Sequence, residues 1–161
     1  MRLTDLLTSD RVATRASVVS AHGDGSFDKA KAIRALSEML ARGAEVGVAD
    51  VERVLLEREA LQSTGIGDGV GIPHGALAQL ETQCAALLIV PAGVDFAAID
   101  SALVYILFAV IGPKRATGEH LKTLARVSRL LRNKAFRDRL ISAPDSKTAY
   151  DLIEAEEGDR P

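Results

Sequence analysis

Cysteine, aromatic residues and long apolar segments are all scarce in this chain of 161 residues. Its single cysteine, Cys84, excludes an internal disulfide and a cysteine-based zinc site, and we expect a small buried residue there. The two most hydrophobic segments, Cys84–Val90 and Ala102–Gly112, are far shorter than the roughly 20 residues of a membrane-spanning helix, so we expect no membrane insertion. No apolar stretch precedes Asp10, which argues against a signal peptide and predicts a cytoplasmic location.

The overall composition is typical of one globular domain. Hydrophobic residues make up 47% and charged residues 26%, with 13 Gly and 5 Pro, which excludes collagen-like, coiled-coil and disordered chains. Aromatics are only 4% and Trp is absent, so the core must consist mainly of Leu, Ile, Val and Ala.

The net charge of −2 conceals a basic segment. Between Lys114 and Arg139, nine Lys and Arg residues stand against two acids, so the rest of the chain carries a charge of −9. Helical spacing places Lys122, Arg126 and Arg129 on one stripe, which is either the solvated face of an amphipathic helix or a docking face for an acidic partner. A nucleic-acid partner is not expected, because the pI is about 5.9 and no recognition motif is visible.

Hydrophobic periodicity predicts helices in both halves of the chain. Ser26 precedes an expected helix over Phe27–Arg42, for which Gly43 supplies the C-terminal stop. Asp50 is expected to cap a second helix, from Val51 to about Leu61. Three more helices are expected over about 118–133, 134–141 and 147–156.

Two apolar, branched runs predict strands: Cys84–Val90, which ends at Pro91, and Leu103–Ile111, which ends at Gly112 and Pro113. Neither run alternates with polar residues, so both faces of these strands should be buried. The sequence therefore predicts an α/β domain with helices covering the sheet.

The segment Ser63–Gly75 has glycine at every second position from Gly65 to Gly71. In an extended backbone, all four glycines would lie on one face. Each glycine lowers the stability of the fold by roughly 0.5–1 kcal/mol relative to alanine, so we expect the glycines to serve a function. Two functions are considered: backbone N–H groups that bind an anion, or a surface without side chains that another protein approaches closely.

Known nucleotide-binding loops do not fit this segment. The dinucleotide fingerprint that could start at Gly65 and Gly67 needs a third glycine where Val70 stands, and the segment contains no Lys for a P-loop. No metal-ligand signature such as H-E-x-x-H is present either, which disfavours a metal-dependent hydrolase.

His74 ends the segment between Pro73 and Gly75. Imidazole is a good nucleophile near neutral pH, and a phosphoryl group on its nitrogen remains transferable. The alternative is a loop histidine without a role, which would leave the cost of the glycines unexplained.

Ser63–Gly75 resembles the active-site signature of the IIA domains of the bacterial phosphoenolpyruvate-dependent phosphotransferase system (PTS), fructose/mannitol type 2, and most of all their nitrogen-regulatory branch. The resemblance runs from Leu3 to about Glu156. It implies one α/β domain over residues 1–156 with a mixed β-sheet flanked by helices on both faces, and a frayed tail over 157–161. Further matching positions are Leu56–Glu59, Val94–Asp100, Leu103–Ile111, His120, Leu121 and Leu124.

This resemblance also implies roles for individual residues. His74 would be phosphorylated on Nε2 by a histidine phosphocarrier similar to HPr, with Arg58 and His120 as the other active-site residues. Thr64 and Gly75 would support the phosphoryl group, and neither a cofactor nor a metal is implied.

Alternatives remain for two of these residues. His120 begins a helical stripe with Leu124, Val127 and Leu131, so it is either a site residue at a helix N-terminus or a core histidine bonded to a carbonyl. Arg58 is either a phosphoryl ligand or one half of a surface ion pair with a neighbouring glutamate.

The expected function is therefore a phosphoryl-accepting regulatory protein whose target proteins the sequence does not name. The alternative is a stand-alone IIA subunit that passes phosphate to a fructose- or mannitol-type IIB protein for sugar uptake. A binding module that is never phosphorylated is a third possibility, but it leaves His74 without a role. The remaining histidine, His22, lies in a polar turn and is expected at the surface.

Overall fold

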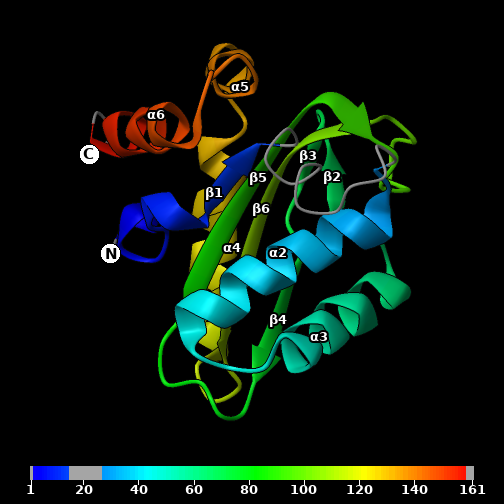
Figure 1. Ribbon diagram of the computed structural model, residues 1–161, viewed down its shortest axis with the longest axis vertical. Helices are drawn as coiled ribbons and strands as arrows, with labels where there is room; N and C mark the ends of the chain where they lie inside the picture. The colour runs from blue at the N-terminus through cyan, green and yellow to red at the C-terminus, as the bar shows by residue number, and fades with distance from the viewer. Residues whose placement is uncertain (1, 15–26, 159–161) are drawn as a thin grey trace.

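A six-stranded sheet forms the centre of the computed structural model, which describes residues 2–14 and 27–158 (Figure 1). The strand order is β1-β5-β6-β3-β2, and β4 also pairs with β6. His22 and Ser26, for which the sequence predicts a surface turn and a helix start, lie outside the described residues. The strands are β1 (Val12–Thr14), β2 (Gly65–Gly67), β3 (Val70–Gly71), β4 (His74–Leu77), β5 (Cys84–Val94) and β6 (Val104–Pro113).

The sheet is mixed, as the family resemblance implied. β5 and β6 are antiparallel, whereas β1 runs parallel to β5 and both β3 and β4 run parallel to β6. Both predicted strands are real but longer than expected, since they end at Val94 and Pro113 instead of Val90 and Ile111. β5 continues because its pairing with β6 resumes at Val94 after a register shift.

Side chains of the two central strands alternate between two separate cores. Leu88 and Leu107 lie in the core beneath α2 and α3, and Leu87, Ile89 and Phe108 lie in the core on the opposite side. All five are fully buried. The prediction that both faces of these strands are buried is confirmed.

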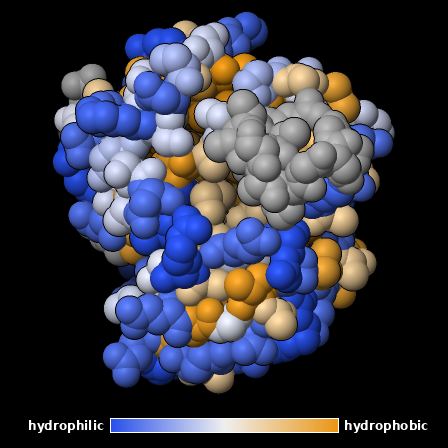
Figure 2. All heavy atoms as spheres, viewed as in Figure 1, coloured by the Kyte–Doolittle hydropathy of each residue, from blue (hydrophilic) through white to orange (hydrophobic). Residues whose placement is uncertain are grey.

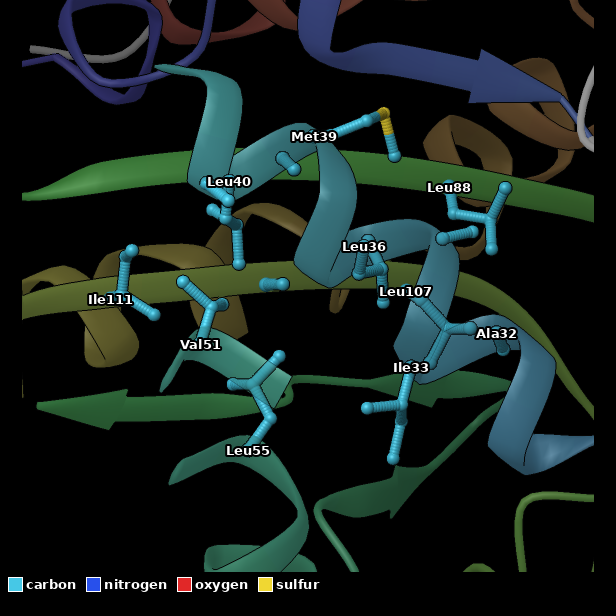
Figure 3. Close-up of a cluster of buried hydrophobic side chains, with 14 of the residues drawn as sticks. Ala32, Ile33, Leu36, Met39, Leu40, Val51, Leu55, Leu88, Leu107 and Ile111 are labelled. Atoms are coloured by element: carbon cyan, nitrogen blue, oxygen red, sulfur yellow. The ribbon is translucent and has the colours of Figure 1, made fainter. Parts of the chain in front are cut away.

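Helices α2 (Lys29–Ala44) and α3 (Val48–Leu61) cover one face of the sheet. Figure 3 shows their apolar side chains packed over β5 and β6, with Leu36 among the residues of α2 and Leu55 among those of α3. Cys84 is buried in this core, as expected. On the outer side of these helices, hydrophilic side chains predominate (Figure 2).

Three helices pack on the other side of the sheet, together with the N-terminal segment. Their bounds are α4 (Thr117–Leu130), α5 (Lys134–Ile141) and α6 (Ser146–Gly158). α6 runs two residues beyond its predicted end at Glu156, so Glu157 belongs to the helix and not to a frayed tail. The Glu157 carboxylate accepts hydrogen bonds from the amides of Leu3 and Thr4 at 2.7 and 3.1 Å, which holds the two ends of the described chain together. None of the helices in residues 2–14 and 27–158 is long and apolar enough to cross a membrane.

The predicted stop of the first helix at Gly43 is wrong. α2 continues through Gly43, and Glu45, with φ of 58°, is the left-handed residue that ends it. A Cβ at Gly43 would lie 2.6 Å from the Arg11 side chain, so Gly43 gives that side chain room to pack on the helix. At the other end, the Asp28 side chain caps the helix by accepting from the Lys31 amide at 2.9 Å.

The predicted cap of the second helix at Asp50 is also wrong. α3 begins at Val48 after Gly47, so Asp50 lies within its first turn. A carboxylate in the first turn still stabilises the helix by interacting with its dipole. Because Asp is favoured both at the cap and in the first turn, the sequence alone does not distinguish the two positions.

Glu59 ties the end of α3 to the segment that precedes β2. Its buried carboxylate pairs with Lys29 at 2.8 Å and accepts from the amide and the hydroxyl of Thr64. We expect Glu59→Ala to lower the free energy of unfolding by about 2–3 kcal/mol, because Lys29 and both donors of Thr64 lose a charged acceptor. Glu57→Ala is the matched control: Glu57 is exposed, its ion pair with Arg53 is 3.5 Å long, and its removal should change stability by less than about 0.5 kcal/mol. Equal unfolding midpoints in urea for the two variants would contradict the role given to Glu59.

Candidate functional site

The glycine segment forms a tight hairpin. β2 and β3 pair antiparallel, and the turn residues Gly67, Asp68 and Gly69 have φ of 97°, 58° and 75°. These left-handed conformations require the two glycines. The expectation of four glycines on one extended face is wrong, because the turn reverses the chain. Gly65 and Gly71 instead leave room for side chains of the chain itself.

His74 is the first residue of β4, and its backbone is fixed by pairing with Val110 of β6. Its ring Nδ1 lies 2.7 Å from the carbonyl oxygen of Ile72. A carbonyl can only accept, so Nδ1 carries the proton and Nε2 carries the lone pair. The ring is only partly buried and borders two cavities, which gives a phosphoryl donor access to it.

His120 lies in the first turn of α4, and its ring centroid is 5.6 Å from that of His74. The two rings are tilted by 49°. The predicted inward stripe on this helix is confirmed, because Val127 and Leu131 are buried and Leu124 is partly buried. His120 Nδ1 is enclosed and forms no hydrogen bond with a described residue, so the interpretation as a core histidine bonded to a carbonyl does not apply to that nitrogen.

Arg58 lies in the last turn of α3 and forms neither of the ion pairs considered from the sequence. Its Nη1 donates to the Gln62 carbonyl at 2.8 Å, while Glu57 pairs with Arg53 and Glu59 with Lys29. The rest of the guanidinium is therefore available to another acceptor.

Two cavities meet at Arg58 and His74. The larger, of about 440 Å³, is also lined by His120 and by two further cations, Arg53 and Lys114. The smaller, of about 220 Å³, is also lined by residues of the glycine segment and of α4. The predicted site residues Arg58, His74 and His120 thus lie around one space, although 62 residues of sequence separate the first from the last.

Thr64 and Gly75, the two residues expected to support the phosphoryl group, have different roles in the structure. Thr64 lines the smaller cavity, but its hydroxyl donates to Glu59 and is not free to donate to a phosphoryl group. A Cβ at Gly75 would lie 2.9 Å from Val54 Cγ2 of α3. The absence of a side chain at Gly75 therefore lets β4 approach α3, which brings His74 close to Arg58.

Comparison with known proteins assigns the family. The sequence model of the family described as phosphoenolpyruvate-dependent sugar phosphotransferase system, EIIA 2, matches residues 21–156. The chain belongs to this EIIA 2 family.

Its relatives include both regulatory and sugar-specific EIIA 2 proteins. The chain is 36% identical over 156 residues to a nitrogen regulatory protein of Pseudomonas aeruginosa, covering 95% of each. It superposes on the crystal structure of nitrogen regulatory protein IIA-Ntr from Neisseria meningitidis with a TM-score of 0.82 at 26% identity, covering 94% of this chain and 98% of that chain. It is also 33% identical over 99 residues to a fructose-specific EIIA component of Haloferax volcanii, covering 62% of this chain and 64% of that protein.

Two cations of this EIIA 2 site were missed by the sequence reasoning. Lys114 follows the last residue of β6, and Arg53 lies on the exposed side of α3. Both line the larger cavity with His74. The position of Lys114 directly after a buried strand is a signal that could have found it, whereas the exposed helical position of Arg53 looks like any solvated residue.

The basic stripe of α4 is exposed along its length in the EIIA 2 fold. Lys122, Arg126 and Arg129 all face solvent, and Arg126 is 4.0 Å from the Glu157 carboxylate. The choice between a solvated face and a docking face stays a prediction.

No group of three or more His, Cys, Asp or Glu side chains within residues 2–14 and 27–158 could hold a metal ion.

Both site histidines should stay neutral to a lower pH than an exposed histidine does. Burial is the main cause that lowers the pKa of His74; the charge of Arg58 lowers it further, and the hydrogen bond to Ile72 opposes this. The pKa of His120 is lowered mainly by burial and then by the nearby His74. We expect NMR titration midpoints below about 6.5 for both rings. The unfolded chain then binds more protons than the folded one, so stability should fall as the pH decreases from about 6.5 to the lowered pKa. Midpoints at or above the ordinary value would contradict the burial of these rings.

Proposed function

We propose that this EIIA 2 domain accepts a phosphoryl group on Nε2 of His74 from a phosphohistidine of an HPr-like carrier, in the cytoplasm, and thereby regulates partner proteins. The observation that carries the proposal is the bond from Nδ1–H to the Ile72 carbonyl, which leaves Nε2 of the partly buried ring with the lone pair. In the transfer, the P–N bond to the donor imidazole breaks as the bond to Nε2 forms, and the electron pair of the broken bond stays on the donor nitrogen.

Positioning and charge stabilisation would account for the catalysis. The transition state of phosphoryl transfer is loose and spreads charge over three equatorial oxygens. Arg58 presents a planar, permanently charged fork to those oxygens, and His120 can donate from Nε2. Lys114 and Arg53, in the wall of the same cavity, add positive charge.

Exposed apolar side chains around the site favour a protein as the phosphoryl donor. Leu61 lines the larger cavity, Ile66 and Ile99 line the smaller one, and Leu121 follows His120 on α4. These four side chains are between 49% and 82% exposed. Exposed apolar side chains gathered around one site are typical of a surface that a protein partner covers, whereas a small phosphate donor would leave them exposed to water.

The second candidate function is sugar uptake, in which the domain passes its phosphoryl group to a fructose- or mannitol-type IIB protein. The similarity to a fructose-specific EIIA component supports it. The similarity to nitrogen regulatory proteins supports the regulatory function more strongly, because it extends over 95% of the chain.

Two successive transfers test these functions. The protein is incubated with phosphoenolpyruvate, enzyme I and the phosphocarrier, and its intact mass is measured under alkaline conditions. We expect a gain of one phosphoryl group that is lost in acid; no gain with an active donor set rules out both functions. Fructose- and mannitol-type IIB domains are then added. Retention of the phosphoryl group supports regulation, and rapid transfer to a IIB domain rejects it in favour of sugar uptake.

A further inference from the structure

Two enclosed polar atoms in the described part of the chain lack a hydrogen-bond partner, and both lie behind the site. They are Oε1 of Gln83 and Nδ1 of His120. Enclosed polar atoms are rarely left unpaired, because each has lost its bonds to water. Both side chains border Gly112, so a small rearrangement of the Gln83 side chain could join them by one bond.

Gln83 and His120 face each other across the bare Cα of Gly112. Gln83 directly precedes β5 and is only 8% exposed, and the pairing of Cys84 with Ile111 places it opposite Gly112 of β6. A Cβ at Gly112 would lie 3.1 Å from Gln83 Cγ and 3.3 Å from His120 Nδ1. The missing side chain at Gly112 leaves the room that the Gln83 side chain and the His120 ring share.

We propose that Gln83 is a positioning residue for His120: its amide NH₂ donates to Nδ1 of His120 and holds the proton of that ring on Nε2. The amide oxygen and nitrogen exchange places by a half-turn of the terminal amide group, and the two atoms are nearly indistinguishable in shape. After that turn the amide nitrogen occupies the enclosed position, and one bond satisfies both it and Nδ1 of His120. Gln83 also lines a cavity of about 390 Å³, together with Thr82 and Gln79, which is large enough for water to bond the displaced amide oxygen.

The consequence for the site depends on the proposed function. A neutral imidazole has one N–H, so a donor to Nδ1 leaves Nε2–H as the group that faces a phosphoryl group between His120 and His74. The opposite tautomer would turn a lone pair toward the anion. Burial lowers the pKa of His120, so near pH 7.5 the tautomer and not the charge decides whether the ring donates.

The experiment measures the tautomer of His120 directly and the transfer rate separately. In ¹⁵N NMR of the whole unphosphorylated chain near pH 7.5, we expect protonated Nε2 and unprotonated Nδ1 for His120. In Gln83→Met, which keeps the side-chain length but cannot donate, the proton should redistribute toward Nδ1. Phosphoryl acceptance should then slow about tenfold, the order found when a partner that orients a histidine ring is removed. Thr82→Ala, an exposed neighbour in the wall of the same cavity, should change neither readout.

A wild-type His120 with its proton on Nδ1 overturns the proposal, and so does an unchanged tautomer in Gln83→Met. The wild-type spectrum locates the proton even where the variant does not fold, so the proposal stays open to refutation. The same spectrum separates the two proposals. A wild-type chain that accepts no phosphoryl group rejects the proposed function, while the position of the His120 proton still decides on the role of Gln83.

Discussion

His74→Ala should abolish phosphoryl acceptance completely. The substitution removes the only atom proposed to form the new P–N bond, whereas the other groups of the site can only hold the phosphoryl group. The ring is half-buried and its hydrogen bond reaches only the nearby Ile72 carbonyl, so the fold should survive. The measurement is intact mass under alkaline conditions after incubation with the phosphorylated carrier.

The matched control is His22→Ala, which removes the histidine to which no role is assigned. It should gain one phosphoryl group as the unaltered chain does. A phosphorylated His74→Ala protein, with a circular dichroism spectrum equal to that of the unaltered chain, would assign the acceptor to another residue and reject the proposed function.

Arg58→Ala should slow phosphoryl transfer by about 10²–10³-fold, the effect of removing one preorganised donor from a developing anion. The guanidinium donates from Nη1 to the Gln62 carbonyl at 2.8 Å, and its other donors remain for the equatorial oxygens. Arg58→Lys should recover only part of the rate, because an ammonium group keeps the charge but lacks the planar fork. Single-turnover transfer from the phosphorylated carrier measures the rates of both variants and of the unaltered chain.

Arg34→Ala provides the control for a lost surface arginine. Arg34 is an exposed cation on α2 with its own acidic partners, Glu38 and Glu52, and it lines neither cavity of the site. The rate of phosphoryl transfer to Arg34→Ala should equal that of the unaltered chain. A normal rate in Arg58→Ala would remove Arg58 from the site while leaving the role of His74 intact.

The site combines residues from the helices on both faces of the sheet and from the sheet itself. Arg58 comes from α3 on one face of the sheet, His120 from α4 on the other, and His74 from β4, which pairs with β6. Two glycines make the approach possible, since Gly75 leaves room for α3 and Gly112 leaves room for the His120 ring. A substitution in either glycine would therefore move site residues without touching their chemistry.

Local sequence patterns predicted the parts of the fold that depend on burial alone. The apolar runs that became β5 and β6 were recognisable because strands buried on both faces exclude polar residues. The apolar periodicity of α2 and α4 was recognisable because one face of each helix packs on the sheet. Helix ends were less predictable: Gly43 looked like a stop but serves the packing of Arg11, and a carboxylate such as Asp50 suits both a cap and a first turn.

The sequence by itself determined the α/β class, the two central strands, the family resemblance and His74 as the candidate nucleophile, because periodicity and motif spacing are properties of neighbouring residues. Only the tertiary structure decided that the glycines form a hairpin and that the Ile72 carbonyl holds the His74 proton on Nδ1. It also decided that Arg58 pairs with neither neighbouring glutamate, and that Gln83 and His120 both border Gly112. Each of these depends on which strands pair and in which register, and such through-space contacts join residues whose separation along the chain carries no local signal.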